Sequence, residues 1–220
     1  MWLVKFNFRV TDMTQSTLNL PTNRIETLAD GIFAIAMTLL VLGISVPNLP
    51  SSTDPQVFSA YIFSIIPEIF VYILSFILLA VFWLNHHVFF VIKKSDITLL
   101  WINIFFLMSI AIVPFTTTLI GKYGKFQLSV LLFDLNMLII GILFYSIFAY
   151  SVRHDFIVES VKKNSKIILR SNLILPILAI ISIIISFFNP LWSIFVFFLL
   201  PIIFTLYNFA RHLFIRNKTI

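Results

Sequence analysis

The chain has 220 residues, of which 60% are apolar and only 11% are charged, and its formal net charge is +6. A soluble domain of this size carries about 25% charged residues, because its surface must face water. The composition, with a mean hydropathy of +1.05, therefore excludes a water-soluble globular domain, a disordered tail and a fibrous repeat. It predicts an all-α integral membrane protein. Because the chain has no cysteine, disulfides, Cys-based zinc sites and thiol redox chemistry are excluded as well.

The stretches between charged residues locate the expected membrane helices, since a helix needs about 20 mostly apolar residues to cross the bilayer. Residues 171–210 carry no formal charge, and one helix of that length would be about 60 Å long, twice the hydrocarbon thickness. Asn189-Pro190 at the midpoint of this run is a turn signal, so we expect two helices there. The sequence thus predicts six transmembrane helices, at about residues 23–46, 57–90, 97–120, 127–152, 168–188 and 191–214.

The basic residues predict the orientation of the chain. Six crossings put both termini on one side, and 13 of the 15 Lys and Arg residues fall on that side, all except Lys122 and Lys125. An excess of positive charge marks the cytoplasmic face, so we expect both termini in the cytoplasm and a multi-pass protein of the cell membrane. Residues 1–22 lack the long apolar run of a signal peptide. They are expected to form a leader that is flexible or lies on the surface, before a six-helix domain at 23–217.

The first expected helix has charged residues at its inner end and an apolar run after Asp30. At 100° per residue, Ile35, Thr38 and Leu42 form one stripe with a single hydroxyl, whereas Asp30 lies about 140° from Ile35. Spacing alone permits two interpretations of this stripe. It is either ordinary helix packing or a pore-lining face, whose apolar constrictions gate by dewetting and by partial dehydration of ions.

The run from Arg24 to Pro47 resembles the signature first helix of the lysosomal-type transmembrane potassium channel family and its prokaryotic relatives. The usual form is Arg-x-x-x-Phe-Ser-Asp followed by Gly and an apolar Ala/Ile/Thr/Leu run, and here Leu28-Ala29-Asp30 stands in place of Phe-Ser-Asp. The resemblance is strong over about residues 24–125. In the second and third helices it rests on Ser75-Phe76, Trp83, His86-His87, Trp101, Asn103, Phe106-Leu107 and Pro114-Phe115-Thr116.

The resemblance implies a cation channel with six helices per repeat, in which the first helix lines the pore. Because this chain has a single repeat, the resemblance implies a homotetramer. It assigns the pore constriction and ion selectivity to Ile35, Thr38 and Leu42. It also implies a structural polar network on the cytoplasmic side, made of Arg24, Asp30, His86, His87 and Asn103.

The expected function is therefore a potassium-permeable, weakly to moderately selective monovalent cation channel. K+ is its permeating ion, and we expect no bound cofactor. The expected partners are further copies of the chain and membrane lipid, without nucleic acid. The alternatives are a secondary transporter for a small cation and a membrane scaffold. Transporters usually show inverted repeats, and no repeat is visible in this sequence.

Other motifs carry weaker signals. His86 and His87 point 100° apart on a helix, whereas metal-binding pairs prefer i,i+4 spacing, so no metal site is expected. Residues 121–124 lack the order of a carbonyl filter and are interpreted as a loop turn. Glu68 and Asp134 lie within expected membrane helices, where an acid is either functional or bonded to another helix. No Ser-His-Asp arrangement, catalytic carboxylate pair or phosphate loop is found, so we do not expect an enzyme.

Overall fold

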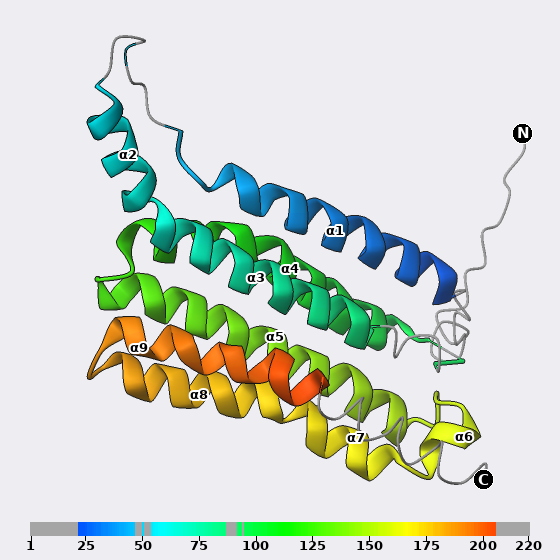
Figure 1. Cartoon of the computed structure of the whole chain (residues 1–220). Helices are drawn as coiled ribbons and strands as arrows, with labels where there is room; N and C mark the ends of the chain where they lie inside the picture. The colour runs from blue at the N-terminus through cyan, green and yellow to red at the C-terminus, as the bar shows by residue number, and fades with distance from the viewer. Residues whose placement is uncertain (1–21, 47–49, 51–53, 87–91, 94, 206–220) are drawn as a thin grey trace, which may run out of the picture.

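The computed structural model describes residues 22–46, 50, 54–86, 92–93 and 95–205. These residues form a bundle of helices that lie side by side along one direction (Figure 1). Within this part of the chain, five helical segments are long and apolar enough to cross a membrane: Arg24–Leu42, Pro55–His86, Ile97–Tyr123, Gln127–Arg153 and Ser165–Ser186. A sixth apolar helical segment, Pro190–Thr205, is shorter and ends where the described residues end. The expected count of six crossings therefore stays a prediction.

The helix α1 (Thr22–Leu42) lies on one side of the bundle and contacts α3 (Ile66–His86) and α4 (Ile97–Tyr123). In Figure 1, α8 and α9 lie on the opposite side of the bundle, with α3, α4 and α5 between them and α1. Thus α1 contributes to the core through one face only.

The second expected helix, 57–90, is not continuous. It is divided at Ile65 into α2 (Pro55–Ser64) and α3. Pro67 lacks a backbone N–H and its ring clashes with the preceding turn, which breaks or kinks a helix. Asp54 starts α2 by accepting a hydrogen bond from the Gln56 N–H at 2.7 Å, as an N-cap residue does. No residue of α2 is buried, and α2 leans away from the bundle (Figure 1).

The helices α4 and α5 (Gln127–Arg153) form an antiparallel hairpin at the centre of the bundle. Asp96 caps α4 by accepting from the Leu99 N–H at 2.8 Å, and its other oxygen accepts from the Tyr150 hydroxyl at 2.6 Å. The interpretation of residues 121–124 as a loop turn was wrong. Gly121 to Tyr123 form the last turn of α4, and only Gly124 lies outside it as the C-cap.

The C-terminal part begins with a short helix, α6 (Glu159–Lys162), followed by α7 (Ser165–Asn172) and α8 (Ile174–Ser186). The predicted turn at Asn189-Pro190 is present. The Asn189 side chain accepts from the Leu191 N–H at 3.0 Å and starts α9 (Pro190–Ile194), which continues as a 3-10 turn, η3 (Phe195–Phe198). The tight turn brings α9 back against α8.

The helix ends alternate between the two ends of the bundle. The start of α1, the end of α3, the start of α4 and the end of α5 lie at the same end (Figure 1). Among the described basic residues, Arg24, Lys93 and Arg153 lie at this end, whereas Lys122 and Lys125 lie at the opposite end, in the last turn of α4 and in the turn that follows it. An excess of positive charge is typical of the cytoplasmic face, and the orientation of the chain in the membrane stays a prediction.

Candidate functional site

The orientation of α1 is set by a buried stripe that faces α3 and α4. Its members recur at intervals of three or four residues and are at most 5% exposed: Ile25, Ala29, Phe33, Ala36 and Leu40. Phe33 is the largest of them. Its ring centroid lies 6.0 Å from that of His86 and 6.2 Å from that of Phe106, so an aromatic cluster fixes the rotation of α1 about its axis.

The stripe of Ile35, Thr38 and Leu42 lies on the opposite face of α1. Each of the three follows a buried residue by two positions, which places it about 200° further around the helix. Ile35 is 60% exposed and Leu42 is 76% exposed, and Thr38 is exposed between them. An added Cβ at Gly31, on the same face, would meet no atom within 4 Å. Within the described part of the chain, therefore, this face contacts no other helix.

The hydroxyl of Thr38 has a defined orientation. Its Oγ1 donates a hydrogen bond to the Ile35 carbonyl at 2.8 Å, one turn back along α1. A hydroxyl has one hydrogen and two acceptor lone pairs. Because the hydrogen is used within the helix, Thr38 presents an oxygen to the space beside α1. This is the chemistry that a dehydrated cation requires.

Asp30 has one hydrogen-bond partner among the described residues. Its Oδ1 accepts from the Trp83 Nε1–H at 2.9 Å, so the carboxylate joins α1 to α3. The resemblance implied a polar network in which Asp30 lies with Arg24 and the histidines. Arg24 is exposed at the start of α1, and the two salt bridges found within the described part of the chain both involve Lys162.

His86 and Asn103 form a second polar pair. His86 Nε2 lies 3.0 Å from Asn103 Oδ1, and both side chains are buried between α3 and α4. The His86 ring also stacks on Phe106 at 5.5 Å with an interplanar angle of 9°. Three members of the expected network thus take part in two hydrogen-bonded pairs, Asp30–Trp83 and His86–Asn103. His87 lies outside the described residues.

The C-terminal end of α1 has a polar contact that the sequence did not predict as such. The Glu68 carboxylate accepts from the Ser45 N–H at 3.3 Å, and the Tyr61 hydroxyl donates to the Ser45 carbonyl. The chain just beyond α1 is thus tied to both α2 and α3. The signal in the sequence was Glu68 beside Pro67, an acid that could equally be functional or bonded between helices.

Comparison with known proteins bears on this arrangement of helices. Residues 24–114 match the family described as endosomal/lysosomal potassium channel TMEM175. The chain is 30% identical over 145 residues to a potassium channel of Chryseobacterium sp., a match that covers 66% of this chain and 69% of that protein. The chain belongs to the TMEM175 family.

Two further matches agree with this family. The chain is 38% identical over 103 residues to a potassium channel of Chamaesiphon minutus, covering 46% of this chain and 50% of that protein. Its fold matches the crystal structure of a lysosomal potassium-selective channel TMEM175 homolog from Chamaesiphon minutus, with a TM-score of 0.67 and 28% identity. The structural match covers 84% of this chain and 96% of that chain. This member of the TMEM175 family is therefore an integral membrane protein with the fold of a TMEM175 channel.

In this TMEM175 family member, Leu28 and Ala29 have different environments. Ala29 is fully buried on the face of α1 that contacts the bundle, whereas Leu28 is 51% exposed. Ala29, which stands in place of the usual serine, therefore lies in the packed interior without a hydroxyl.

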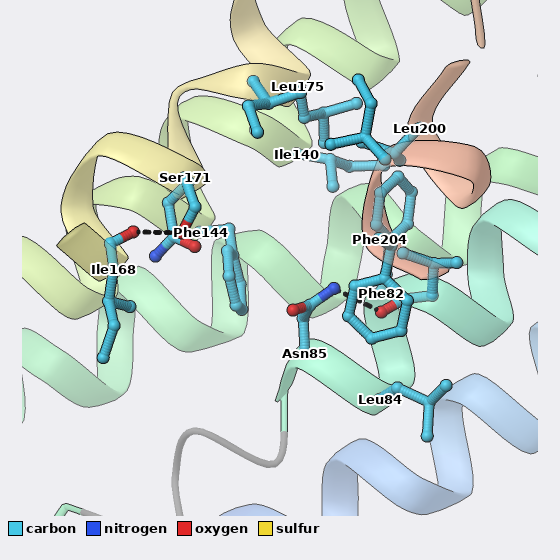
Figure 2. A pocket seen from close by; sticks show the side chains of 15 residues that line it. Phe82, Leu84, Asn85, Ile140, Phe144, Ile168, Ser171, Leu175, Leu200 and Phe204 are labelled. Atoms are coloured by element: carbon cyan, nitrogen blue, oxygen red, sulfur yellow. Dashed lines mark hydrogen bonds between the residues drawn. The ribbon is translucent and has the colours of Figure 1, made fainter. Parts of the chain in front are cut away.

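A cavity of about 350 Å³ lies away from α1, between α3, α5, α7, α8 and the segment that follows η3. Figure 2 shows apolar side chains around it, among them Ile140, Phe144 and Phe204. Two of its polar side chains bond to their own helices, since Asn85 donates to the Val81 carbonyl and Ser171 to the Ile168 carbonyl. The third, Asn172, has a buried Nδ2 without a hydrogen-bond partner within the described residues. Over the described residues, no group of three or more His, Cys, Asp and Glu side chains is placed to hold a metal ion.

Proposed function

We propose that this protein is a potassium-permeable, weakly to moderately selective monovalent cation channel of the cell membrane. The observation that carries the proposal is the exposed stripe of Ile35, Thr38 and Leu42 on a helix whose other face is packed. The names of the related proteins, which include potassium channels of Chryseobacterium and Chamaesiphon, support K+ as the permeating ion.

A pore built from this stripe requires several copies of the chain, because each chain supplies one such helix. We propose a homotetramer with four α1 helices around a central axis. Oligomers of identical chains usually have closed rotational symmetry, and here the contacts between copies would run through the membrane helices. In a tetramer Ile35, Thr38 and Leu42 each form a ring of four side chains.

The three rings have different roles in the proposed constriction. Ile35 and Leu42 are seven residues apart, about 10 Å along the helix, and their apolar rings exclude water when the pore is narrow. Between them the four Thr38 oxygens replace part of the hydration shell of an ion. K+ gives up water more readily than Na+, because its charge density is lower, so a narrow ring of neutral oxygens favours K+.

The lack of carboxylates on the stripe limits this selectivity. No Asp or Glu lies on the stripe, and the Asp30 carboxylate is bonded to Trp83 on α3. A pore without carboxylates does not bind divalent cations tightly, so we expect modest selectivity among monovalent cations. We assign Asp30, His86 and Asn103 a structural role, together with Arg24 and His87 on the cytoplasmic side.

Recording the purified protein in a planar bilayer, with K+ on one side and Na+ on the other, tests the proposed function. The expected result is a conductance whose reversal potential shows preference for K+. Flux that saturates and requires a second, counter-transported ion would instead identify a secondary transporter. Native mass spectrometry in mild detergent tests the assembly, and a conducting monomer would contradict the proposed tetramer.

A further inference from the structure

A buried acidic side chain lies far from α1, where α5 meets the turn between α8 and α9. Asp134 of α5 is fully buried, and so are Ser182 of α8 and Ser193 of α9. The Ser182 Oγ lies 2.9 Å from Asp134 Oδ1 and 3.0 Å from the Ser193 carbonyl oxygen. Three helices therefore meet at one serine hydroxyl.

The number of hydrogens at this junction restricts the charge of Asp134. A serine hydroxyl has one hydrogen, and a carbonyl oxygen can only accept. If Ser182 donates to the Ser193 carbonyl, its contact with Asp134 Oδ1 is a hydrogen bond only when Asp134 supplies the second hydrogen. A protonated Asp134 donates to Ser182, and Ser182 donates to Ser193, so both short contacts become hydrogen bonds.

An ionised Asp134 leaves this junction incomplete. The single Ser182 hydrogen could then bond either to Asp134 or to the Ser193 carbonyl. The other contact would hold two oxygen atoms close together with no hydrogen between them. In addition, Asp134 Oδ2 is buried without a hydrogen-bond partner within the described part of the chain. A buried carboxylate that lacks partners is costly and usually becomes neutral, whereas the carbonyl oxygen of a neutral acid tolerates this position better.

The elements packed against this part of α5 bring no opposite charge. No Asp, Glu, His, Lys, Arg, Tyr or Cys is present in α8, α9 or η3. On α4, Lys122 and Tyr123 are exposed in its last turn, and α7 carries Lys166 and Arg170 at the other end of the bundle. No cation among these groups faces Asp134 to stabilise its ionised form.

We propose that Asp134 is a proton-binding site, and that its neutral acid joins α5 to the α8–α9 hairpin through Ser182. Release of the proton turns the Ser182 hydrogen toward the carboxylate and removes the hydrogen bond between Ser182 and the Ser193 carbonyl. The bound proton thus stabilises the packing of the hairpin. This site is separate from the exposed face of α1, so it holds whether or not the protein conducts ions.

Infrared spectroscopy of the full-length protein in lipid vesicles tests the protonation state. The difference spectrum between the wild type and Asp134→Asn should contain the carbonyl band of one protonated carboxylic acid at neutral pH. Ser182→Ala should shift this band to higher frequency without removing it, because the acid then loses its acceptor. Should Asp134→Asn fold poorly, the Ser182→Ala shift alone decides the question. A wild-type spectrum that has no protonated-acid band sensitive to either change overturns the proposal.

The stability of the folded protein should depend on whether Asp134 is protonated. A folded state that holds one more proton than the unfolded state loses stability as the pH rises, by about tenfold in the unfolding constant per pH unit. We expect this loss of stability at alkaline pH in the wild type. We expect it equally in the control variant Glu68→Gln, which changes a half-buried acid in the first turn of α3. Asp134→Asn keeps a donor for Ser182 and carries no titratable proton, so its profile should lack that slope. Identical profiles for the wild type and Asp134→Asn contradict the proposal.

Discussion

Phe33 and Ile35 lie two positions apart on α1 and point in nearly opposite directions. Phe33 is 1% exposed and packs against His86 and Phe106, whereas Ile35 is 60% exposed. The aromatic cluster that fixes Phe33 therefore also sets the direction of the stripe that we propose to line the pore. In the proposed pore, packing and permeation are therefore coupled through the rotation of a single helix.

Shortening the apolar side chains of the stripe should widen the constriction. We expect Ile35→Ala and Leu42→Ala to raise the leak current in planar bilayers, with little change in melting temperature, because both side chains are exposed within the chain. Val41→Ala is the matched control. Val41 is 49% exposed but lies about 120° away from Ile35, so its conductance should equal that of the wild type. A conductance equal to that of the wild type in all three variants would mean that the stripe does not line the pore.

Removing the hydroxyl of Thr38 should reduce the preference for K+. Thr38→Val keeps the shape of the side chain and removes the oxygen, so the K+/Na+ permeability ratio should fall. Thr38→Ser keeps the hydroxyl and should keep most of that ratio. The ratio is measured from reversal potentials under bi-ionic conditions. If the Val and Ser variants both retain the wild-type ratio, the Thr38 oxygen takes no part in selection.

The hydrogen bond between Asp30 and Trp83 should appear as a coupling energy. We expect Asp30→Ala and Trp83→Phe to be destabilising separately, and the double variant to lose about 1 kcal/mol less than the sum, which is the worth of a typical hydrogen bond. Thermal unfolding in detergent gives the three differences. A coupling of zero would show that the bond of 2.9 Å adds nothing to stability, and a pairing of Asp30 with Arg24 would then be favoured.

Two glycines in different surroundings should respond oppositely to alanine. An added Cβ at Gly141 would lie 2.7 Å from Pro176 Cδ, whereas one at Gly31 would meet nothing within 4 Å. We expect Gly141→Ala to lower the melting temperature, since overpacking costs about 1–3 kcal/mol and α5 and α8 must separate. Gly31→Ala should leave it unchanged or raise it, because Ala is the better helix former by about 1 kcal/mol. A similar effect at both positions would show that the contact between α5 and α8 is not close.

Local patterns placed Ile35, Thr38 and Leu42 on one face of α1 and placed the turn at Asn189-Pro190, and the structure has both; a pore-lining role of that face stays a prediction. The stripe follows from the regular 100° step of a helix, and the turn from an N-capping side chain followed by proline. The break at Ile65 was missed, although Pro67 was visible. A run of apolar residues on both sides of the proline hides the division, because each half remains hydrophobic enough for a membrane helix.

Partners across helices were harder to predict than positions along one helix. The sequence singled out Asp30, His86 and Asn103, but it did not show that the Trp83 indole N–H donates to the Asp30 carboxylate. The pairing depends on how α1 and α3 cross, which is decided by the packing of Phe33 and its neighbours. Likewise, Asp134 was recognised as an acid within the membrane, but its serine partners come from residues 48 positions and more away.

The orientation of the Thr38 hydroxyl also has a consequence for protons. Protons move through water by exchange along a continuous chain of donors and acceptors, and a hydroxyl joins such a chain only if it can pass on its hydrogen. The Thr38 hydrogen is held by the Ile35 carbonyl, and apolar side chains lie on either side of it along the stripe. In the proposed pore the ring of Thr38 oxygens accepts hydrogen bonds but does not pass on a proton. A proton crossing the ring would therefore have to travel as a hydrated ion.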